Sequence, residues 1–323
     1  MRILTNPNFN FIKWRWHAIV LSIAVIGAGA ITILQRGGLP LGVDFSGGSV
    51  VILHFDQPVA EDAVRGALRG VTSEAVVQRY GSVPNQVMIR TPLDAAQDSN
   101  LDSNVKKIED AMRAANIGSF TRVKADLVGS VVGEDLKRKG IWATLTALGG
   151  ILLYIGFRFR FSFAAGAVVA TFHDIAVTLA FLTWFGYDVS LNIIAAILTI
   201  AGYSVNDTIV IFDRVRENQR VRRRESLDSI VNEAVNQTLS RTIITAGVTF
   251  LAVMALYLFG GEVLRGFAFT MLVGIITGTY STVFIASAVA ILLSKKSGPT
   301  QAGGKAAGGK ATKAGDARKA RAS

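Results

Sequence analysis

The sequence contains no cysteine, and only 18% of its 323 residues are charged. The lack of cysteine excludes a disulfide framework and thiol chemistry. The three histidines, His17, His54 and His173, are too few and too scattered for a metal site, and we expect no cofactor. An enzyme is the least expected class, because neither water-facing part shows a nucleophile–base pair. Ordinary soluble domains carry about 25% charged residues, so this composition is also low for that class.

Hydrophobic residues are abundant, at half of the chain, and they gather in long apolar runs. A helix needs about 20 apolar residues to cross a hydrocarbon core of about 30 Å. The runs predict a polytopic α-helical membrane protein with six transmembrane helices. We expect the spans at 17–35, 140–157, 161–185, 191–212, 242–259 and 266–293, with a cytoplasmic loop at 213–241. A cleaved signal peptide is the alternative for the first run, although the apolar part of such peptides is typically only 7–15 residues long.

Charge is distributed unevenly within the net charge of +11. The tail after Leu293 carries eight basic residues and one acidic residue, whereas residues 36–139 carry thirteen of each. Basic short segments remain on the cytoplasmic side, so we expect residues 1–16 and 294–323 to be cytoplasmic and residues 36–139 to be periplasmic. The low-complexity tail is expected to be disordered and to contact anionic lipid. Nucleic acid is not an expected partner, because the basic excess flanks membrane segments.

Residues 36–139 are numerous enough for a small folded domain. Alternating apolar residues predict strands, and apolar residues at helical spacing predict two helices between them. In order, the expected elements are strand 47–55, helix 58–69, strands 74–80 and 85–90, helix 99–115 and strand 120–128. This β-α-β-β-α-β order is that of an α+β ferredoxin-like domain.

Two aspartates, Asp207 and Asp174, lie within expected spans. An aspartate at such a depth costs about 2.5–3.5 kcal/mol on insertion scales and by default marks a transport pathway or a partner. Arg241, at the start of the fifth span, has a side chain long enough to extend toward Asp207. The supporting polar residues are Asn206, Thr208, His173 and Asp213, and we expect Asp213 to belong to the solvated turn with Arg214 and Arg216.

Two interpretations of these carboxylates remain open. In the first, Asp207 and Asp174 relay protons, because burial raises and a nearby arginine lowers the proton affinity of a carboxylate. In the second, Asn206, Asp207 and Arg241 form a fixed polar clamp between helices, and His173 completes a packing network around Asp174. Interhelical hydrogen bonds in membranes contribute only about 1 kcal/mol each, so a clamp would be a modest stabiliser.

Several longer motifs carry a family resemblance. They are GVDFSGG (Gly42–Gly48), VGSVVGEDL (Val128–Leu136), GYSVNDTIVIFDRVREN (Gly202–Asn218), NQTLSRTIITAG (Asn236–Gly247) and GGEVLRGFAFTMLVGIITGTY (Gly260–Tyr280). In this order the chain resembles the SecF side of the SecD/SecF family of bacterial protein-export proteins, within the resistance–nodulation–division superfamily. The resemblance covers nearly the whole chain except the tail.

The resemblance implies a six-span half-transporter in the bacterial inner membrane that is paired with SecD. It implies association with the SecYEG channel, with YajC and YidC as further candidates, and contact with unfolded preprotein, protons and membrane lipids. The implied activity is use of the proton-motive force to promote late translocation of preproteins. The family's transport aspartate corresponds to Asp207 and its membrane arginine to Arg241; Asp174 also matches a family position.

Two other functions compete with this one. A proton-coupled exporter of small molecules or lipids is built on the same superfamily, but such exporters usually carry two six-span halves with larger outer domains. A purely structural assembly subunit is the other alternative, and in that case replacing Asp207 with asparagine is expected to be harmless.

Overall fold

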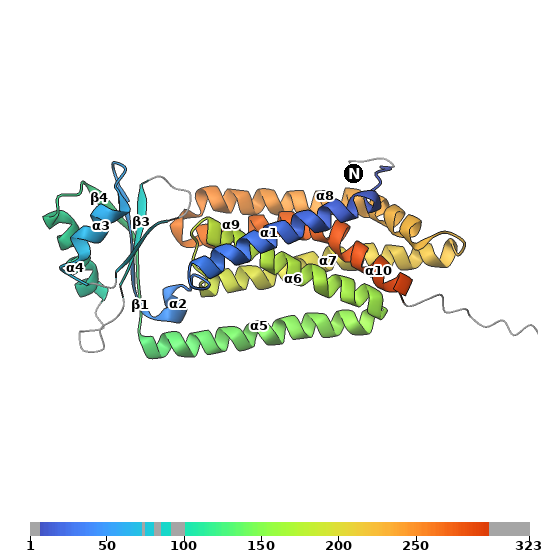
Figure 1. The fold of residues 1–323 in the computed structure, drawn as a ribbon, viewed down its shortest axis with the longest axis horizontal. Coiled ribbons are helices and arrows are strands. Elements are labelled where there is room, and N and C mark those ends of the chain that lie inside the picture. The colour runs from blue at the N-terminus through green and yellow to red at the C-terminus, as the bar shows by residue number, and fades with distance from the viewer. Residues whose placement is uncertain (1–6, 73–74, 81–84, 92–100, 297–323) are drawn as a thin grey trace, which may run out of the picture.

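The molecule is elongated, with a small sheet-containing domain at one end and a bundle of long helices extending away from it (Figure 1). The computed structural model describes residues 7–72, 75–80, 85–91 and 101–296. The described N-terminal segment lies at the end of the bundle opposite the domain. Most of the predicted tail, 294–323, falls outside the described residues.

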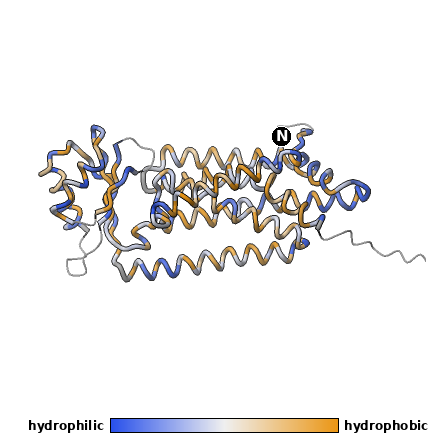
Figure 2. The backbone as a smooth tube through the Cα atoms, in the orientation of Figure 1, coloured by the Kyte–Doolittle hydropathy of each residue, from blue (hydrophilic) through white to orange (hydrophobic). Residues whose placement is uncertain are grey.

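Six helices are long and apolar enough to cross a membrane, which confirms the predicted fold class. The first four spans are formed by α1 (Arg15–Gln35, after the short η1, Ile12–Trp14), α5 (Ser130–Arg158), α6 (Phe161–Trp184) and α7 (Leu191–Val221). The last two are α8 (Leu227–Phe259) and the sequence α9 (Gly261–Ser281), η2 (Thr282–Ala286) and α10 (Ser287–Lys296). Figure 2 shows apolar colouring along the bundle and hydrophilic colouring at its far end.

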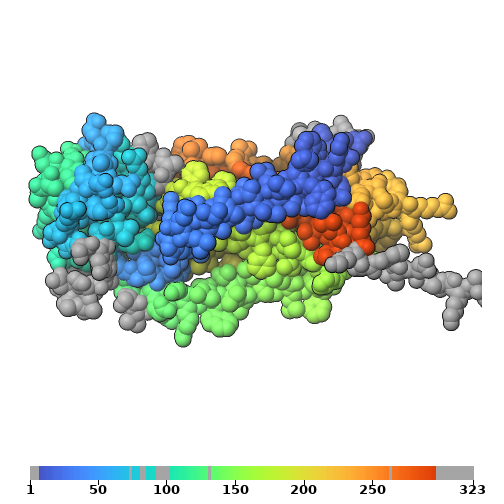
Figure 3. Space-filling model, in the orientation of Figure 1, coloured from blue at the N-terminus to red at the C-terminus, as the bar shows by residue number. Residues whose placement is uncertain are grey.

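The six spans divide into an inner and an outer set. In the most apolar stretches of α6, α7 and the last span, 56%, 50% and 61% of the residues are buried. The corresponding shares are 17% for the first span, 11% for α5 and 17% for α8. Figure 3 shows the first helix lying over one surface of the bundle and α5 along its edge. The outer helices therefore present apolar side chains to lipid or to a partner.

The small domain has a four-stranded antiparallel sheet in the order β2-β3-β1-β4. Its elements are β1 (Gly48–Phe55), α3 (Glu61–Leu68), β2 (Val76–Arg79), β3 (Gln86–Thr91), α4 (Leu101–Ala114) and β4 (Phe120–Val128). One face of the sheet packs against α3 and α4 through a core that includes Val51, Leu53, Val64 and Ile108. This order and strand pairing confirm the predicted ferredoxin-like domain.

The helix of the second span begins ten residues before the predicted span, at Ser130. Charged pairs one turn apart favour this extension, including Asp135 with Lys139 at 2.7 Å. The extension packs against α2 (Val43–Ser46), which follows the first span. A Cβ on Gly133 would lie only 3.0 Å from the backbone nitrogen of Gly47, which itself has a φ of +67°. Two of the sequence motifs thus meet at a glycine-to-glycine contact.

The predicted cytoplasmic loop 213–241 is mostly helical, which corrects the sequence expectation. α7 continues to Val221 and α8 begins at Leu227, so only residues 222–226 connect them. Arg222 forms ion pairs with Glu225 and Glu233, and the Ser226 side chain caps α8 by accepting the Ser229 N–H at 3.2 Å. Hydropathy marks where a helix leaves the apolar layer, whereas pairing and capping decide where it ends.

The last span contains a π-helical turn, η2, between α9 and α10. Before it, a Cβ on Gly278 would approach the Cβ of Ser204 on α7 to 3.1 Å. Ala286, the last residue of this turn, and Ala290 of α10 lie against Gly166 of α6, where a Cβ would be 2.5 Å from the Ala286 carbonyl oxygen. π-helical turns within α-helices are often found at functional sites.

Candidate functional site

Asp174 lies in the middle of α6 and is fully buried, with 0% of its surface exposed. Its Oδ2 atom accepts hydrogen bonds from the hydroxyls of Ser204 (2.6 Å) and Ser281 (2.8 Å), which come from α7 and α9. Its Oδ1 atom lies 3.0 Å from Nδ1 of His173. All three inner spans therefore meet at this carboxyl group, and both of its oxygens have partners.

The His173 ring connects Asp174 to the first span. Nε2 of His173 lies 2.8 Å from the Ser22 hydroxyl on α1. The Ser22 hydroxyl lies 3.3 Å from the Tyr280 hydroxyl of α9, which donates to the Ala18 carbonyl oxygen at 2.7 Å. A continuous line of polar groups thus crosses the bundle from Asp174 to α1.

Asp207 lies on the neighbouring inner helix, α7, and is only 4% exposed. Its Oδ2 atom has no hydrogen-bond partner among the described residues. The next residue, Thr208, instead turns into the core, where its hydroxyl bonds to the Ser204 carbonyl oxygen and contacts the Thr282 hydroxyl, both at 3.1 Å. Asp207 therefore combines deep burial with an unsatisfied oxygen, an arrangement that costs free energy in any apolar environment.

The direct contacts of the clamp interpretation of Asp207 are absent among the described residues. Within the part of the chain that the structure describes, no ion pair of 4.0 Å or less joins Asp207 to Arg241, although the two interact electrostatically. Arg241 is exposed on α8, and Asn206 is exposed on α7. The helical rotation of about 100° per residue separates Asn206 from its neighbour Asp207, so one faces outward and the other inward.

Asp213 is held by a residue that the sequence analysis did not associate with it. Its two carboxylate oxygens accept from Arg158 Nη2, at the end of α5, at 2.7 and 2.8 Å. Arg214, which we expected to share a solvated turn with Asp213, bonds to Glu217 and to Gln237, each at 2.6 Å. Asp213 therefore fastens the outer helix α5 to α7 at the bundle end, at side chains that are 34% and 41% exposed.

At the other end of the bundle, the small domain docks on the connection between α6 and α7. Arg90 and Gln78, from strands β3 and β2, both donate to Asp188. Burial raises the pKa of Asp188 above its ordinary value, even though Arg90 and Gln78 act to lower it. The rings of Tyr80 and Tyr187 pack edge to face beside this group, 6.0 Å apart.

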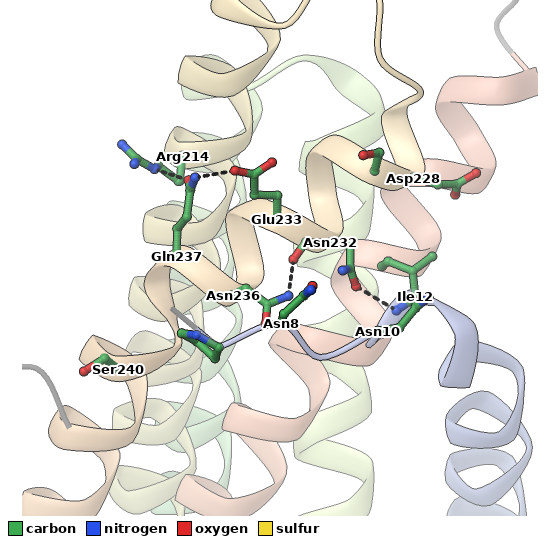
Figure 4. A pocket seen from close by; sticks show the side chains of 12 residues that line it. Asn8, Asn10, Ile12, Arg214, Asp228, Asn232, Glu233, Asn236, Gln237 and Ser240 are labelled. Carbon is green, nitrogen blue, oxygen red and sulfur yellow. Dashed lines mark hydrogen bonds between the residues drawn. The ribbon is translucent and has the colours of Figure 1, made fainter. Parts of the chain in front are cut away.

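A polar pocket of about 950 Å³ lies at the end of the bundle far from the domain (Figure 4). The N-terminal segment crosses it, and the side chains of Asn232 and Asn236 form hydrogen bonds with the segment's backbone. Both amides donate to the Phe9 carbonyl oxygen, at 3.0 and 2.8 Å, while Asn236 accepts the Phe9 N–H at 2.9 Å. Asn232 also accepts the Ile12 N–H at 3.3 Å. The N-terminal segment therefore forms part of the pocket's wall.

The comparisons with known proteins agree with the fold. Residues 107–296 match the family described as "Protein export membrane protein SecD/SecF, C-terminal", and residues 37–59 match the "SecD/SecF GG Motif". The chain belongs to the SecD/SecF protein-export family. "Protein translocase subunit SecF" from Desulfurispirillum indicum is 39% identical over 86% of this chain and 89% of that protein. The subunit of the same name from Pseudomonas aeruginosa is 42% identical over 88% and 91%.

A solved SecDF structure supplies the structural counterpart. The translocon-associated membrane protein SecDF from Thermus thermophilus superposes with a TM-score of 0.77 at 33% identity over 91% of this chain. The match covers 39% of that longer chain. This SecD/SecF family member is thus a multi-pass membrane protein of protein export that corresponds to less than half of SecDF.

Sequence reasoning found both membrane aspartates but missed most of the groups around Asp174. Ser22, Ser204, Ser281 and Tyr280 are distant in sequence and gather only when α1, α6, α7 and α9 pack. Hydroxyl residues are common in apolar spans, so none of them stands out individually. The nearest signal was the run of small residues in the last span, which permits the close approach of α7 that brings Ser204 to Asp174.

Proposed function

We propose that this SecD/SecF family member acts with a SecD partner to use the proton-motive force in late translocation of preproteins across the bacterial inner membrane. Asp207 is the coupling carboxylate, with Arg241 beside it and Asp174 as a second proton-binding group. The observation that carries this proposal is the burial of Asp207 with one oxygen unpaired. A carboxylate without a fixed partner is free to gain and lose a proton as its surroundings change.

The exposed faces of the bundle support a membrane partner. Asn206 and Arg241 are exposed on helices that lie within candidate spans. Polar side chains against lipid are costly, so a protein surface is the better neighbour for them. The match to 39% of a longer SecDF chain supports SecD in that role. SecYEG, YajC, YidC and the unfolded preprotein are proposed as the surrounding machinery.

We infer that both termini are cytoplasmic and that the small domain is periplasmic. The basic tail residues and the basic N-terminal segment favour the cytoplasmic side. The domain lies at the end of the bundle opposite the N-terminal segment, which accords with this orientation (Figure 1). Family membership favours a polypeptide over the small-molecule or lipid cargo of the alternative exporter.

The test is export into membrane vesicles that carry Asp207→Asn, with and without an imposed proton gradient. We expect the gradient to accelerate late export in the wild type and to have no such effect in the variant. Glu217→Gln is the matched control, because Glu217 is an exposed carboxylate on the same helix. Equal amounts of assembled protein must be present in each vesicle preparation. Acceleration that persists in Asp207→Asn would refute the assignment of Asp207.

A further inference from the structure

The polar line through His173 permits its hydrogen atoms to be assigned. The Tyr280 hydroxyl has one hydrogen, which it donates to the Ala18 carbonyl oxygen, since a carbonyl can only accept. In the contact between Ser22 and Tyr280, Ser22 is therefore the donor. Because the single hydrogen of Ser22 is then committed, Ser22 can only accept from Nε2 of His173. Nε2 must carry a hydrogen.

The other side of the ring meets Asp174. With Nε2 protonated, the 3.0 Å contact between Nδ1 and Oδ1 still requires one hydrogen, either on the ring or on the carboxyl group. Oδ2 is occupied by the two serine hydroxyls that donate to it. The His173–Asp174 pair thus holds one shared proton in addition to the Nε2 hydrogen and is neutral as a whole, which suits a fully buried position.

We propose that Ser22, His173, Asp174 and Tyr280 form a second proton-binding site, separate from Asp207, in which Ser22 and Tyr280 select the tautomer of the histidine. When the site gives one proton to water, His173 keeps a single hydrogen. That hydrogen sits on Nδ1 and is donated to the ionised Asp174. Nε2 becomes an acceptor, and the Ser22 hydroxyl turns from Tyr280 to donate to it. Uptake of a proton from water reverses each step.

The consequence is a link between protonation and helix contact. In the loaded state the Ser22 hydroxyl accepts from His173 of α6 and donates to Tyr280 of α9, so it joins α1 to both helices. In the unloaded state its single hydrogen goes to His173, and the bond to Tyr280 is lost. The first span is also the one that leads into the small domain. A proton in the core therefore decides whether Ser22 also joins the first span to α9.

The Ser22–His173–Asp174 distances are those of a nucleophilic triad, but the surroundings favour proton binding. Ser22 is 6% exposed and lies within a continuous helix, so a substrate carbonyl has no access to it. Among the described residues, Tyr280 of α9 is the titratable side chain beside the pair, with its ring centroid 6.0 Å from that of His173. Asp207 lies three residues after Ser204 on α7. α1 contributes the Ser22 hydroxyl to His173 and the Ala18 carbonyl oxygen to Tyr280.

The experiment is nitrogen-15 magnetic resonance of the full chain in lipid bilayers with labelled histidine. The signal of an imidazole nitrogen that carries hydrogen is distinct from that of a bare one, and subtraction of the His173→Asn spectrum assigns the residue. In the wild type, we expect Nε2 to be protonated at acidic pH and bare at alkaline pH, while Nδ1 stays hydrogen-bonded to Asp174 throughout.

Two variants test the selection of the tautomer. Tyr280→Phe removes the acceptor for Ser22, so at the pH of half-loading the ratio of protonated to bare Nε2 is expected to fall at least about twofold. Ser22→Ala removes the partner of Nε2 in both states, so Tyr280→Phe is expected to leave the ratio unchanged in that background. Tyr154→Phe, at a residue 55% exposed on α5, is the control and leaves the ratio unchanged.

A bare Nε2 at every pH in the wild type would overturn the proposal, as would identical ratios in wild type and Tyr280→Phe. This site extends the proposed proton coupling, yet its readout does not depend on export. If the tautomer changes as expected but Asp207→Asn vesicles still respond to the gradient, the site stands and the proposed function of Asp207 fails. If the tautomer does not change but Asp207→Asn abolishes the response to the gradient, the proposed function of Asp207 stands and the second site is rejected.

Discussion

The surroundings of Asp174 and Asp207 differ more than their positions in neighbouring inner helices suggest. Asp174 is enclosed by two serine hydroxyls and an imidazole, and both of its oxygens have partners. Asp207 is almost as deeply buried, yet its Oδ2 has none among the described residues. Asp174 therefore helps to hold three helices together, whereas the Oδ2 atom of Asp207 contributes no bond between helices.

The difference shows that two proposed proton-binding carboxyl groups can contribute very differently to the stability of one bundle. The donors around Asp174 stabilise one packing of the inner helices. An unsatisfied carboxylate stabilises none, so a rearrangement that brings a partner or water to it lowers the free energy. Each prediction below tests this contrast, beginning with the largest expected effect.

Asp174→Ala is expected to lower the free energy of unfolding by about 3 kcal/mol, since it removes three buried hydrogen bonds at about 1 kcal/mol each. Asp207→Ala removes no side-chain hydrogen bond that the structure describes and is expected to cost less than about 1 kcal/mol. The measurement is unfolding in mixed micelles titrated with a denaturing detergent. Equal losses for the two variants would remove the contrast between the sites.

Ser204→Ala removes one of the donors to Asp174 and is expected to cost about 1 kcal/mol in the same titration. Thr270→Val is its control, because the Thr270 hydroxyl is buried and, among the described residues, bonds only to the Gly266 carbonyl oxygen of its own helix. A loss in Thr270→Val as large as that in Ser204→Ala would show that the bond to Asp174 adds nothing.

Asp188, outside the spans, is a third aspartate with little exposure, since 11% of its side chain is exposed, and we expect a smaller and pH-dependent effect from it. Because its pKa is raised, the folded protein binds this proton more tightly than the unfolded chain does. Its contribution to stability is therefore greatest below the ordinary aspartate range and falls as the pH rises through the raised pKa. Thermal unfolding of the wild type and Asp188→Asn across the acid range should show this component only in the wild type.

The smallest expected effect concerns Asp207 and Arg241. Because no ion pair within 4.0 Å joins them among the described residues, the double-mutant cycle of Asp207→Asn and Arg241→Met should give a stability coupling below about 0.5 kcal/mol. The sequence alone predicts a larger coupling, because it places the arginine within reach of the aspartate. A coupling above about 1 kcal/mol would favour the fixed clamp.

The architecture was predictable because periodicity and apolar run length are local properties. The six spans and the ferredoxin-like order follow from residues close together in sequence. The ends of α5, α7 and α8 were not predictable from hydropathy, since Asp135, Arg222 and Ser226 extend or cap helices outside the apolar layer.

Of the candidate site, only the two membrane aspartates could be predicted from the sequence. Asp174 and Asp207 stand out because carboxylates in apolar spans are uncommon. Their different states depend on which side chains from other helices face them, which the packing of α1, α7 and α9 decides. Asn206 and Thr208, both adjacent to Asp207, point to different surroundings, and the sequence gives no sign of which one faces the core.

The π-helical turn in the last span affects which face of the helix its small residues occupy. The small residues Gly274, Gly278, Ala286 and Ala290 recur at multiples of four, and on a regular helix each step of four advances the face by about 40°. The drift over sixteen residues is about 160°, so a uniform helix would turn its last alanines away from its first glycines. One extra residue in the turn takes back about 100° of this drift and keeps a single seam against α7 and then α6. Deleting one residue from 283–285 would therefore keep all four small residues in the chain and misalign the last two of them in space.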